Sequence, residues 1–258
     1  MLKKFCSALL LLLLIGAMIL PCAVSCAVPY ETSTDAESSE KDTKKEEKTD
    51  TPESETKADK VYANISEMVA DRVNSKYLTD FEETAEVTNY VKISVPGHGD
   101  IILELLPKLA PETVKNFQKL VSEGFYNGLT FHRVMQNFMI QGGDPKGNGT
   151  GYTDQKIKGE FTDNGFKNDL KHLRGVLSMA RGKDNNSASC QFFICDTSNP
   201  HLDGKYATFG YVIAGLGTID SITSVSVGPT AKGEQSVPKT PIVMEKVCFV
   251  RNVKDAQP

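Results

Sequence analysis

The sequence lacks the residue patterns on which most metal-dependent and covalent catalysis relies. Its four histidines share no metal-ligand spacing, so a zinc site is not expected. No Gly-x-Ser-x-Gly elbow occurs, so a serine hydrolase would have no obvious nucleophile. The glycine-rich residues 147–151 lack the lysine of a P-loop, which favours a structural or substrate-lining loop over a phosphate cradle. We therefore expect a protein that uses neither a metal nor a bound cofactor.

Cysteine is also scarce in the part of the chain that looks folded. Cys190, Cys195 and Cys248 lie there, and their spacing matches no zinc or redox motif. Cys190 and Cys195 adjoin the apolar residues 192–194, which favours buried thiols over reactive ones. A disulfide between Cys195 and Cys248 is compatible with an exported protein, but spacing alone does not predict it.

Residues 1–25 are predicted to be an export signal. They begin with Lys3 and Lys4, continue with an apolar run over residues 8–20 and end in small residues. The apolar run is short for a membrane span, which needs about 20 residues. The chain is therefore expected to act outside the cytoplasm.

Two ways of processing this signal are open. Residues 23–26, Ala-Val-Ser-Cys, resemble a bacterial lipobox, in which Cys26 would carry the lipid and become the mature N-terminus. Residues 25–27, Ser-Cys-Ala, also offer a small-x-small site for ordinary cleavage, which would release a soluble protein. The lipobox is favoured, so we expect a lipid anchor on the extracytoplasmic side of the cell membrane. An uncleaved anchor is the third option.

Residues 26–60 are predicted to be a disordered acidic tether. From residue 31 onward they consist largely of Asp, Glu, Lys, Ser and Thr, with no aliphatic side chain larger than alanine. Such a segment cannot bury enough apolar surface to offset the entropy lost on ordering it. A plain spacer that holds a domain away from the membrane is favoured over a charge run that recruits a partner.

The formal net charge of the chain is −4 at pH 7. It becomes more negative when residues 1–25 are removed, because they contain lysines and no acid. An acidic exported chain argues against nucleic acid as the main partner.

Residues 61–85 are a possible helical lead-in to the folded part. Ile65, Met68, Val69 and Val73 recur at helical spacing. A helix that packs on the main domain and a marginal helix in the linker are both open. The folded domain is expected over residues 86–253, followed by a tail over residues 254–258.

The pattern of residues 86–253 predicts a mainly β domain. Alternation over residues 90–95 and 101–105 around a Pro-Gly turn predicts a hairpin. Further strands are expected at residues 175–180, 191–195, 208–213 and 243–250. Helices are expected at residues 111–121, which open on a proline, and at residues 218–225. The stripe of the first helix, Val114, Phe117, Leu120 and Val121, is expected to pack in the core. Many short strands with few helices indicate an antiparallel barrel or sandwich.

Residues 131–144, Phe-His-Arg-Val-Met-Gln-Asn-Phe-Met-Ile-Gln-Gly-Gly-Asp, are the most informative stretch. Strict alternation of a strand puts Arg133, Met139 and Gln141 on one face and Phe138 on the other. A bend between Arg133 and Phe138 would bring all four together. A guanidinium beside an apolar pocket and an amide suits a neutral, amide-rich ligand. On this stretch alone, a core strand whose arginine points to water is an equal alternative.

Four blocks, in this order, make the chain resemble the cyclophilins, which are peptidyl-prolyl cis–trans isomerases. They are residues 131–144, Leu-Ser-Met-Ala-Arg at 177–181, Ser-Cys-Gln-Phe-Phe-Ile at 189–194 and Leu-Asp-Gly-Lys-Tyr-Ala-Thr-Phe-Gly at 202–210. The resemblance covers about residues 86–253. It implies a closed eight-stranded antiparallel barrel capped by two α-helices.

The resemblance also implies the site residues. Arg133 would be the catalytic arginine, which donates a hydrogen bond to the proline nitrogen in the twisted amide. Two glutamines would hold the substrate backbone, and four apolar residues would line the proline pocket. The substrate-binding residues would be Phe138, Met139, Gln141, Gly149, Ala180, Arg181, Gln191, Phe193, Leu202 and Tyr206.

Two positions depart from the pattern of the best-known eukaryotic cyclophilins. His201 stands where those proteins often have tryptophan, so a large indole contact for cyclosporin is replaced. Tyr206 stands where they have histidine. It keeps an aromatic pocket wall, so we expect it to change substrate preference more than turnover.

The implied function is acceleration of X–Pro rotation in exported proteins by a monomer that binds proline-containing polypeptides. A non-catalytic proline-peptide-binding or chaperone module is the alternative, and it would keep the fold without the activity. A tethered ligand-binding lipoprotein would explain the signal and the spacer but not the four blocks.

Overall fold

A computed structural model describes residues 64–73 and 80–253. The predicted signal at residues 1–25 with Cys26, the predicted tether at 26–60 and the tail at 254–258 lie outside the described residues. Among the residues that are described, no helix combines the length and the apolar character that crossing a membrane requires.

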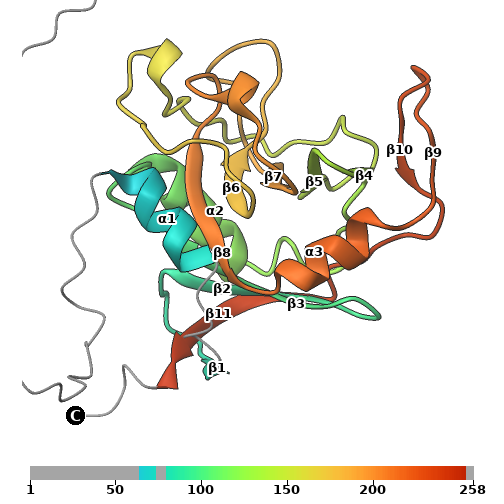
Figure 1. Ribbon diagram of the computed structural model, residues 1–258, viewed down its shortest axis with the longest axis horizontal. Coiled ribbons are helices and arrows are strands. Elements are labelled where there is room, and N and C mark those ends of the chain that lie inside the picture. Colours follow the sequence, from blue (N-terminus) through green and yellow to red (C-terminus); the bar gives the residue numbers. More distant parts are fainter. Residues whose placement is uncertain (1–63, 74–79, 254–258) are drawn as a thin grey trace, which may run out of the picture. The chain divides into compact units, whose positions relative to one another are not determined.

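Strands outnumber helices in the described part of the chain (Figure 1). The three α-helices are α1 (Ile65–Val73), α2 (Pro111–Ser122) and α3 (Leu216–Thr223). The strands are β1 (Phe81–Glu83), β2 (Tyr90–Val95), β3 (Gly99–Leu105), β4 (Arg133–Met135), β5 (Met139–Gly142), β6 (Val176–Met179), β7 (Phe192–Cys195), β8 (Thr208–Ala214), β9 (Val227–Pro229), β10 (Gln235–Pro238) and β11 (Lys246–Asn252).

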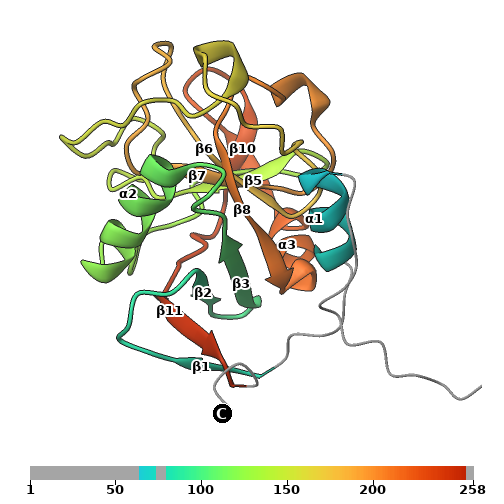
Figure 2. The same cartoon turned by 90° about the vertical axis from the view of Figure 1, so that its left-hand side faces the viewer.

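Eight strands form one antiparallel sheet in the order β11-β2-β3-β8-β6-β7-β5-β4. Strand β1 adds to the outer edge of β11, where the two lie side by side (Figure 2). The two ends of the sheet are joined by the residues just before β4 and β11. Backbone N–H groups of Phe131 and Met244 donate to the carbonyls of Ile242 and Leu129 at 2.9 and 2.8 Å. Thr130 and Val243 pair as an isolated bridge between them. The mainly β, eight-stranded architecture expected from the sequence is confirmed.

The main core lies inside this barrel and is covered by α2 and α3. Helix α2 begins with Pro111, whose missing N–H would have had no partner at a helix start. The predicted stripe of α2 is buried, with Phe117 fully enclosed. The Phe117 ring centroid lies 5.1, 5.4 and 5.2 Å from those of Tyr126, Phe192 and Phe209. Because Phe192 belongs to β7, this aromatic cluster supports the strand that carries Phe193.

Helix α1 packs on the main domain. Of the two alternatives that the sequence left open, it is therefore the packed helix and not a marginal helix in the linker. Val69 is fully buried in a second apolar cluster with Val176 and Tyr211, and α1 contacts β8 (Figure 2). Arg72 Nη1 donates to Glu104 Oε1 at 3.0 Å and to the Tyr211 hydroxyl at 3.0 Å. The helix is thus held by apolar burial and by an ion pair.

The structure differs from the sequence patterns in four places. Residues 81–83, which fall in the possible helical lead-in, form strand β1 and pair with β11. Residues 133–142 are two strands joined by a turn, not one bent strand. Strand β11 begins at Lys246, because residues 242–244 make the irregular pairing that closes the barrel. The hairpin β9–β10 was not anticipated at all. Cys190 and Cys195 are buried free thiols, as favoured from the sequence, and Cys248 is a free, half-buried thiol.

Candidate active site

The hairpin β4–β5 positions the arginine of the predicted site. Its strands pair Arg133 with Gln141 and Met135 with Met139, so the turn falls on residues 136–138. Asn137 has φ 60°, a left-handed conformation that asparagine tolerates better than most residues. This turn takes the place of the bend that was predicted between Arg133 and Phe138. It removes Phe138 from the strand alternation and places it beside Met139, in one apolar cluster with Phe193 and Leu202.

A pocket of about 180 Å³ opens next to this hairpin. Apolar side chains from β5, β7 and the turn at Pro200–Leu202 form one part of its wall, and Arg133, Gln141, Arg181 and Tyr206 supply its polar groups. Nine of the eleven predicted site residues line it: Arg133, Phe138, Met139, Gln141, Ala180, Arg181, Phe193, Leu202 and Tyr206.

Buried polar groups behind the pocket fix its aromatic wall. His172 stacks on Phe193 with centroids 5.9 Å apart and planes at 10°. The His172 ring is held at both nitrogens, Nδ1 to Asp203 Oδ1 and Nε2 to the Ser178 hydroxyl, each at 3.0 Å. Burial lowers the pKa of His172 more than the hydrogen bond to Asp203 raises it. A neutral imidazole with a hydrogen bond at each nitrogen therefore supports the Phe193 ring. At the rim, His201 stacks on Phe138 with centroids 5.7 Å apart.

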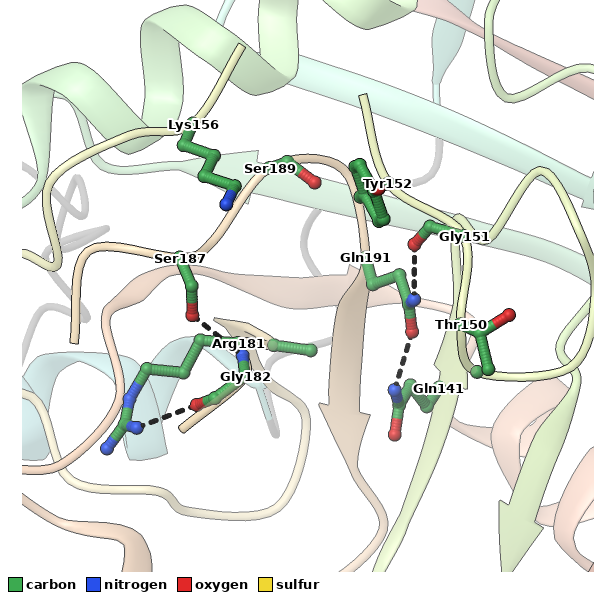
Figure 3. A pocket seen from close by; sticks show the side chains of 12 residues that line it. Gln141, Thr150, Gly151, Tyr152, Lys156, Arg181, Gly182, Ser187, Ser189 and Gln191 are labelled. Atoms are coloured by element: carbon green, nitrogen blue, oxygen red, sulfur yellow. Dashed lines mark hydrogen bonds between the residues drawn. The ribbon is translucent and has the colours of Figure 1, made fainter. Parts of the chain in front are cut away.

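A second pocket of about 270 Å³ adjoins the first and shares Gln141, Ala180 and Arg181 with it. Gly149 and Gln191, the other two predicted residues, line this one. Gln141 Nε2 donates to Gln191 Oε1 at 2.9 Å, and Gln191 Nε2 donates to the carbonyl of Gly151 at 2.7 Å (Figure 3). The two pockets together form one groove. The hydrogen bonds between these amides fix both glutamines along its wall.

Arg181 borders the groove, but its guanidinium is engaged elsewhere. Its Nε and Nη2 donate to the carbonyl of Lys205 at 3.1 and 3.0 Å. Its Cζ lies 4.7 Å from the centroid of the Tyr206 ring and 5.1 Å from that of Phe161. Arg181 therefore fixes the Tyr206 wall of the first pocket more than it offers charge to a ligand.

The loop that carries Gly149 is built around one buried carboxylate. Asp144 is 1% exposed and accepts the backbone N–H groups of Lys146, Asn148 and Gly149 at 2.7, 3.0 and 2.5 Å. Burial raises the pKa of Asp144, but the backbone N–H donors outweigh it, and the pKa ends below its ordinary value. The glycines that first suggested a structural or substrate-lining loop are thus held in place by the last residue of the Gly-Gly-Asp turn.

Replacing Asp144 with asparagine is expected to lower the free energy of unfolding by about 2 kcal/mol at pH 7, because an amide cannot accept all of these N–H bonds. A carboxyl whose pKa is lowered by folding stabilises the fold above its unfolded pKa, near 3.9, and loses that contribution as pH falls. The gap between wild type and Asp144→Asn should therefore be constant above about pH 5 and shrink as the pH falls below about 4. Urea unfolding at a series of pH values measures it, and a gap that stays constant with pH would contradict the role of the carboxylate.

The guanidinium of Arg133 is paired with a carboxylate that sequence patterns did not indicate. Glu234 lies in the loop of the hairpin β9–β10, which stands beside β4 (Figure 1). Arg133 Nε and Nη2 donate to Glu234 Oε1 and Oε2 at 2.7 and 2.9 Å. The hydrogen bonds from Arg133 and then from Ser236 lower the pKa of Glu234 to about 2. The ion pair is therefore fully charged at neutral pH.

All eleven site residues predicted from the sequence lie in the two adjoining pockets. The residues that sequence reasoning missed are those behind the groove: Glu234, His172 and Asp203. Asp203 falls inside the block at residues 202–210, which could have flagged it. Glu234 has no such local signal, because it is a glutamate near a turn and its partner Arg133 lies 101 residues away in the sequence.

The arrangement can bind an apolar ring beside a planar, uncharged backbone. It supplies one cationic hydrogen-bond donor, an apolar cavity and two fixed amides. Burial raises the pKa of the Cys195 thiol to about 12 and also raises that of Cys190, so neither is a ready nucleophile. The groove is suited to changing the conformation of a bound chain rather than cutting it.

Comparison with known proteins gives one consistent family. The profile of the family described as cyclophilin type peptidyl-prolyl cis-trans isomerase/CLD matches residues 90–248. A peptidyl-prolyl cis-trans isomerase of Helicobacter pylori is 45% identical over 144 residues, which are 55% of this chain and 84% of the relative. One of Synechococcus elongatus is 47% identical over 137 residues, which are 50% of this chain and 90% of the relative.

A solved structure gives the same result. The crystal structure of a Cryptosporidium parvum cyclophilin type peptidyl-prolyl cis-trans isomerase, determined in the presence of the dipeptide Ala-Pro, matches with a TM-score of 0.57 and 32% identity. The match covers 63% of this chain and 99% of that one.

Proposed function

Because the chain belongs to the cyclophilin-type peptidyl-prolyl cis-trans isomerases and is an enzyme of that class, we propose that Arg133 drives the rotation. It donates a hydrogen bond from Nη1 to the nitrogen of a proline that sits in the apolar pocket. The observation that carries this mechanism is the placement of the guanidinium on the wall of that pocket, with Gln141 beside it.

Rotation about an X–Pro bond is slow because amide resonance opposes it, with a barrier of about 18–20 kcal/mol. A catalyst must bind the twisted amide more tightly than either planar form. In the twisted amide the proline nitrogen is pyramidal and carries a lone pair. A donor placed at that nitrogen stabilises the lone pair and reduces its conjugation with the carbonyl. No proton has to leave the enzyme.

The remaining groups confine the motion to one side of the bond. The proline ring packs between Phe138, Met139 and Phe193, and the rest of the pocket keeps it in place. Gln141 and Gln191 bind the backbone before the proline, along the second pocket. With the ring held in the pocket, the carbonyl group and the α-carbon before it turn together about the C–N bond. The Ala-Pro dipeptide of the Cryptosporidium parvum crystal is consistent with a ligand of this class.

Exchange NMR on an Ala-Pro peptide tests this function, with the chain that lacks residues 1–26. The uncatalysed exchange takes tens to hundreds of seconds, so catalysis is easily resolved from background. We expect exchange between the cis and trans resonances at substoichiometric enzyme. Peptide binding without faster exchange would instead favour the non-catalytic proline-peptide-binding or chaperone module.

The proposed substrates are proteins that fold outside the cytoplasm, and the proposed location is a lipid anchor at Cys26. Support comes from the signal-like residues 1–25 and the lipobox-like residues 23–26. Growth with a labelled fatty acid should label the wild-type chain and leave Cys26→Ser unlabelled. Label that persists in Cys26→Ser would contradict the anchor, and an unlabelled wild-type chain in the medium would favour the secreted form.

A further inference from the structure

We propose that Glu234 is a positioning residue that determines which edge of the Arg133 guanidinium faces the proline. The proposal rests on the catalytic role proposed for Arg133 and extends it to the hairpin β9–β10. Glu234 lines neither of the two pockets, so its carboxylate acts through the arginine and does not contact the substrate.

The five N–H donors of a guanidinium are divided unequally here. Both oxygens of Glu234 accept from one edge, Nε at 2.7 Å and Nη2 at 2.9 Å. Such a forked pair fixes the plane of the guanidinium as well as its position. The other N–H of Nη2 points to the sulfur of Met135 at 3.2 Å, and Met135 does not line the proline pocket.

The donors left over are those of Nη1. Their contacts are the longest, 3.3 Å to Gln141 Oε1 and 4.0 Å to the sulfur of Met139. Gln141 and Met139 both line the proline pocket. Nη1 is therefore the nitrogen that faces a bound proline, and it does so because the opposite edge is occupied by Glu234.

The carboxylate is itself held in place, as a positioning group must be. The Ser236 hydroxyl, which is fully buried, donates to Glu234 Oε1 at 2.7 Å. The backbone N–H of Glu234 donates to Thr230 Oγ1 at 3.1 Å, and the N–H of Thr230 to the carbonyl of Glu234 at 2.7 Å. Strand β10 in turn contacts β4, which carries Arg133. The hairpin thus places the carboxylate against the strand that carries the arginine.

The test compares Glu234→Ala and Glu234→Gln with wild type by NMR line-shape analysis of a titrated Ala-Pro peptide. This measurement separates the peptide Kd from the rotation rate on the enzyme. A misplaced donor should slow on-enzyme rotation of Glu234→Ala on the order of 10- to 100-fold, with Kd changed less than about threefold. Glu234→Gln, which keeps one acceptor but loses the fork, should fall between Glu234→Ala and wild type.

One further variant and one spectroscopic measurement make the result specific. Lys232→Gln removes a charge from an exposed side chain on the same hairpin, so it should match wild type. The Arg133 Nε–H resonance should be sharp in wild type and lost to exchange in Glu234→Ala, because its acceptor is gone. A change in the hairpin that left the Glu234 carboxylate on Arg133 would keep this resonance sharp.

Several outcomes would overturn the proposal. Glu234→Ala at the wild-type rotation rate would do so, and so would a change in Kd alone. If Glu234→Gln rotated the peptide faster than wild type, the carboxylate would only offset the positive charge of Arg133 and would not position it. Arg133→Ala, measured alongside, separates the two ideas. If it is slow while Glu234→Ala is unchanged, only the role of Glu234 fails, but if it rotates the peptide at the wild-type rate, both fail.

Discussion

Arg133→Ala is expected to lose most of the isomerase activity while it still binds proline peptides. A hydrogen bond from a charged donor contributes about 1.5–3 kcal/mol. If that contribution is made only to the twisted amide, its loss slows rotation about 13- to 160-fold. Peptide affinity should change little, because the pocket wall of Phe138, Met139 and Phe193 remains. Exchange NMR measures the rate, and a peptide titration measures Kd.

Arg133→Lys is the matched variant for this experiment. It keeps the positive charge but replaces a planar fork by a single flexible ammonium, which cannot occupy both oxygens of Glu234 and still face the pocket. We expect it to remain closer to Arg133→Ala than to wild type. An Arg133→Lys enzyme with full activity would show that charge alone suffices. Equal acceleration by wild type and Arg133→Ala would exclude the arginine mechanism.

Phe117→Ala is expected to have the largest effect on stability, a loss of about 3–5 kcal/mol in the free energy of unfolding. The ring is fully buried, and it packs edge-on against Phe192 with an interplanar angle of 90°. Its removal leaves a cavity at the point where α2 meets β7 and β8, and a rigid barrel closes such a cavity only in part. Urea unfolding followed by circular dichroism gives the value.

Lys115→Ala is the control for Phe117→Ala, since Lys115 is exposed on the opposite side of the same helix. Its effect should stay within about 0.5 kcal/mol, as for most surface substitutions. Similar losses for the two variants would mean that the helix itself, and not the aromatic cluster, was being measured. A loss below about 1 kcal/mol for Phe117→Ala would mean that the neighbouring rings fill the space.

The sequence predicted what depends on local pattern. The hairpin of β2 and β3, helix α2 with its buried stripe and the strands β6, β7 and β8 follow from alternation and helical spacing over a few residues. The groove residues came from four blocks whose order resembled a known family. The fold then brought blocks that lie far apart in the chain to one place, which spacing alone cannot show.

What the sequence did not predict depends on long-range contacts. Residues 243 and 244 were predicted to begin a strand, yet residues 242–244 pair irregularly, because they must reach residues 129–131 to close the barrel. The hairpin β9–β10 has short strands with glycine and proline in them, which depresses any strand signal. Glu234 has no local feature that distinguishes it from a surface glutamate. Its role becomes visible only when Arg133 is beside it.

The position of β11 has a consequence for how the protein is made. Among the described strands, the last one, β11, lies between the first two, β1 and β2, which leave the ribosome long before it. Until synthesis reaches Lys246, those early strands have an open edge with unpaired N–H and C=O groups. Pairing across such a large sequence separation is slow compared with local structure. We therefore expect the barrel to form only once β11 has been made, and a chain that ends before residue 242 should remain unfolded and prone to aggregation.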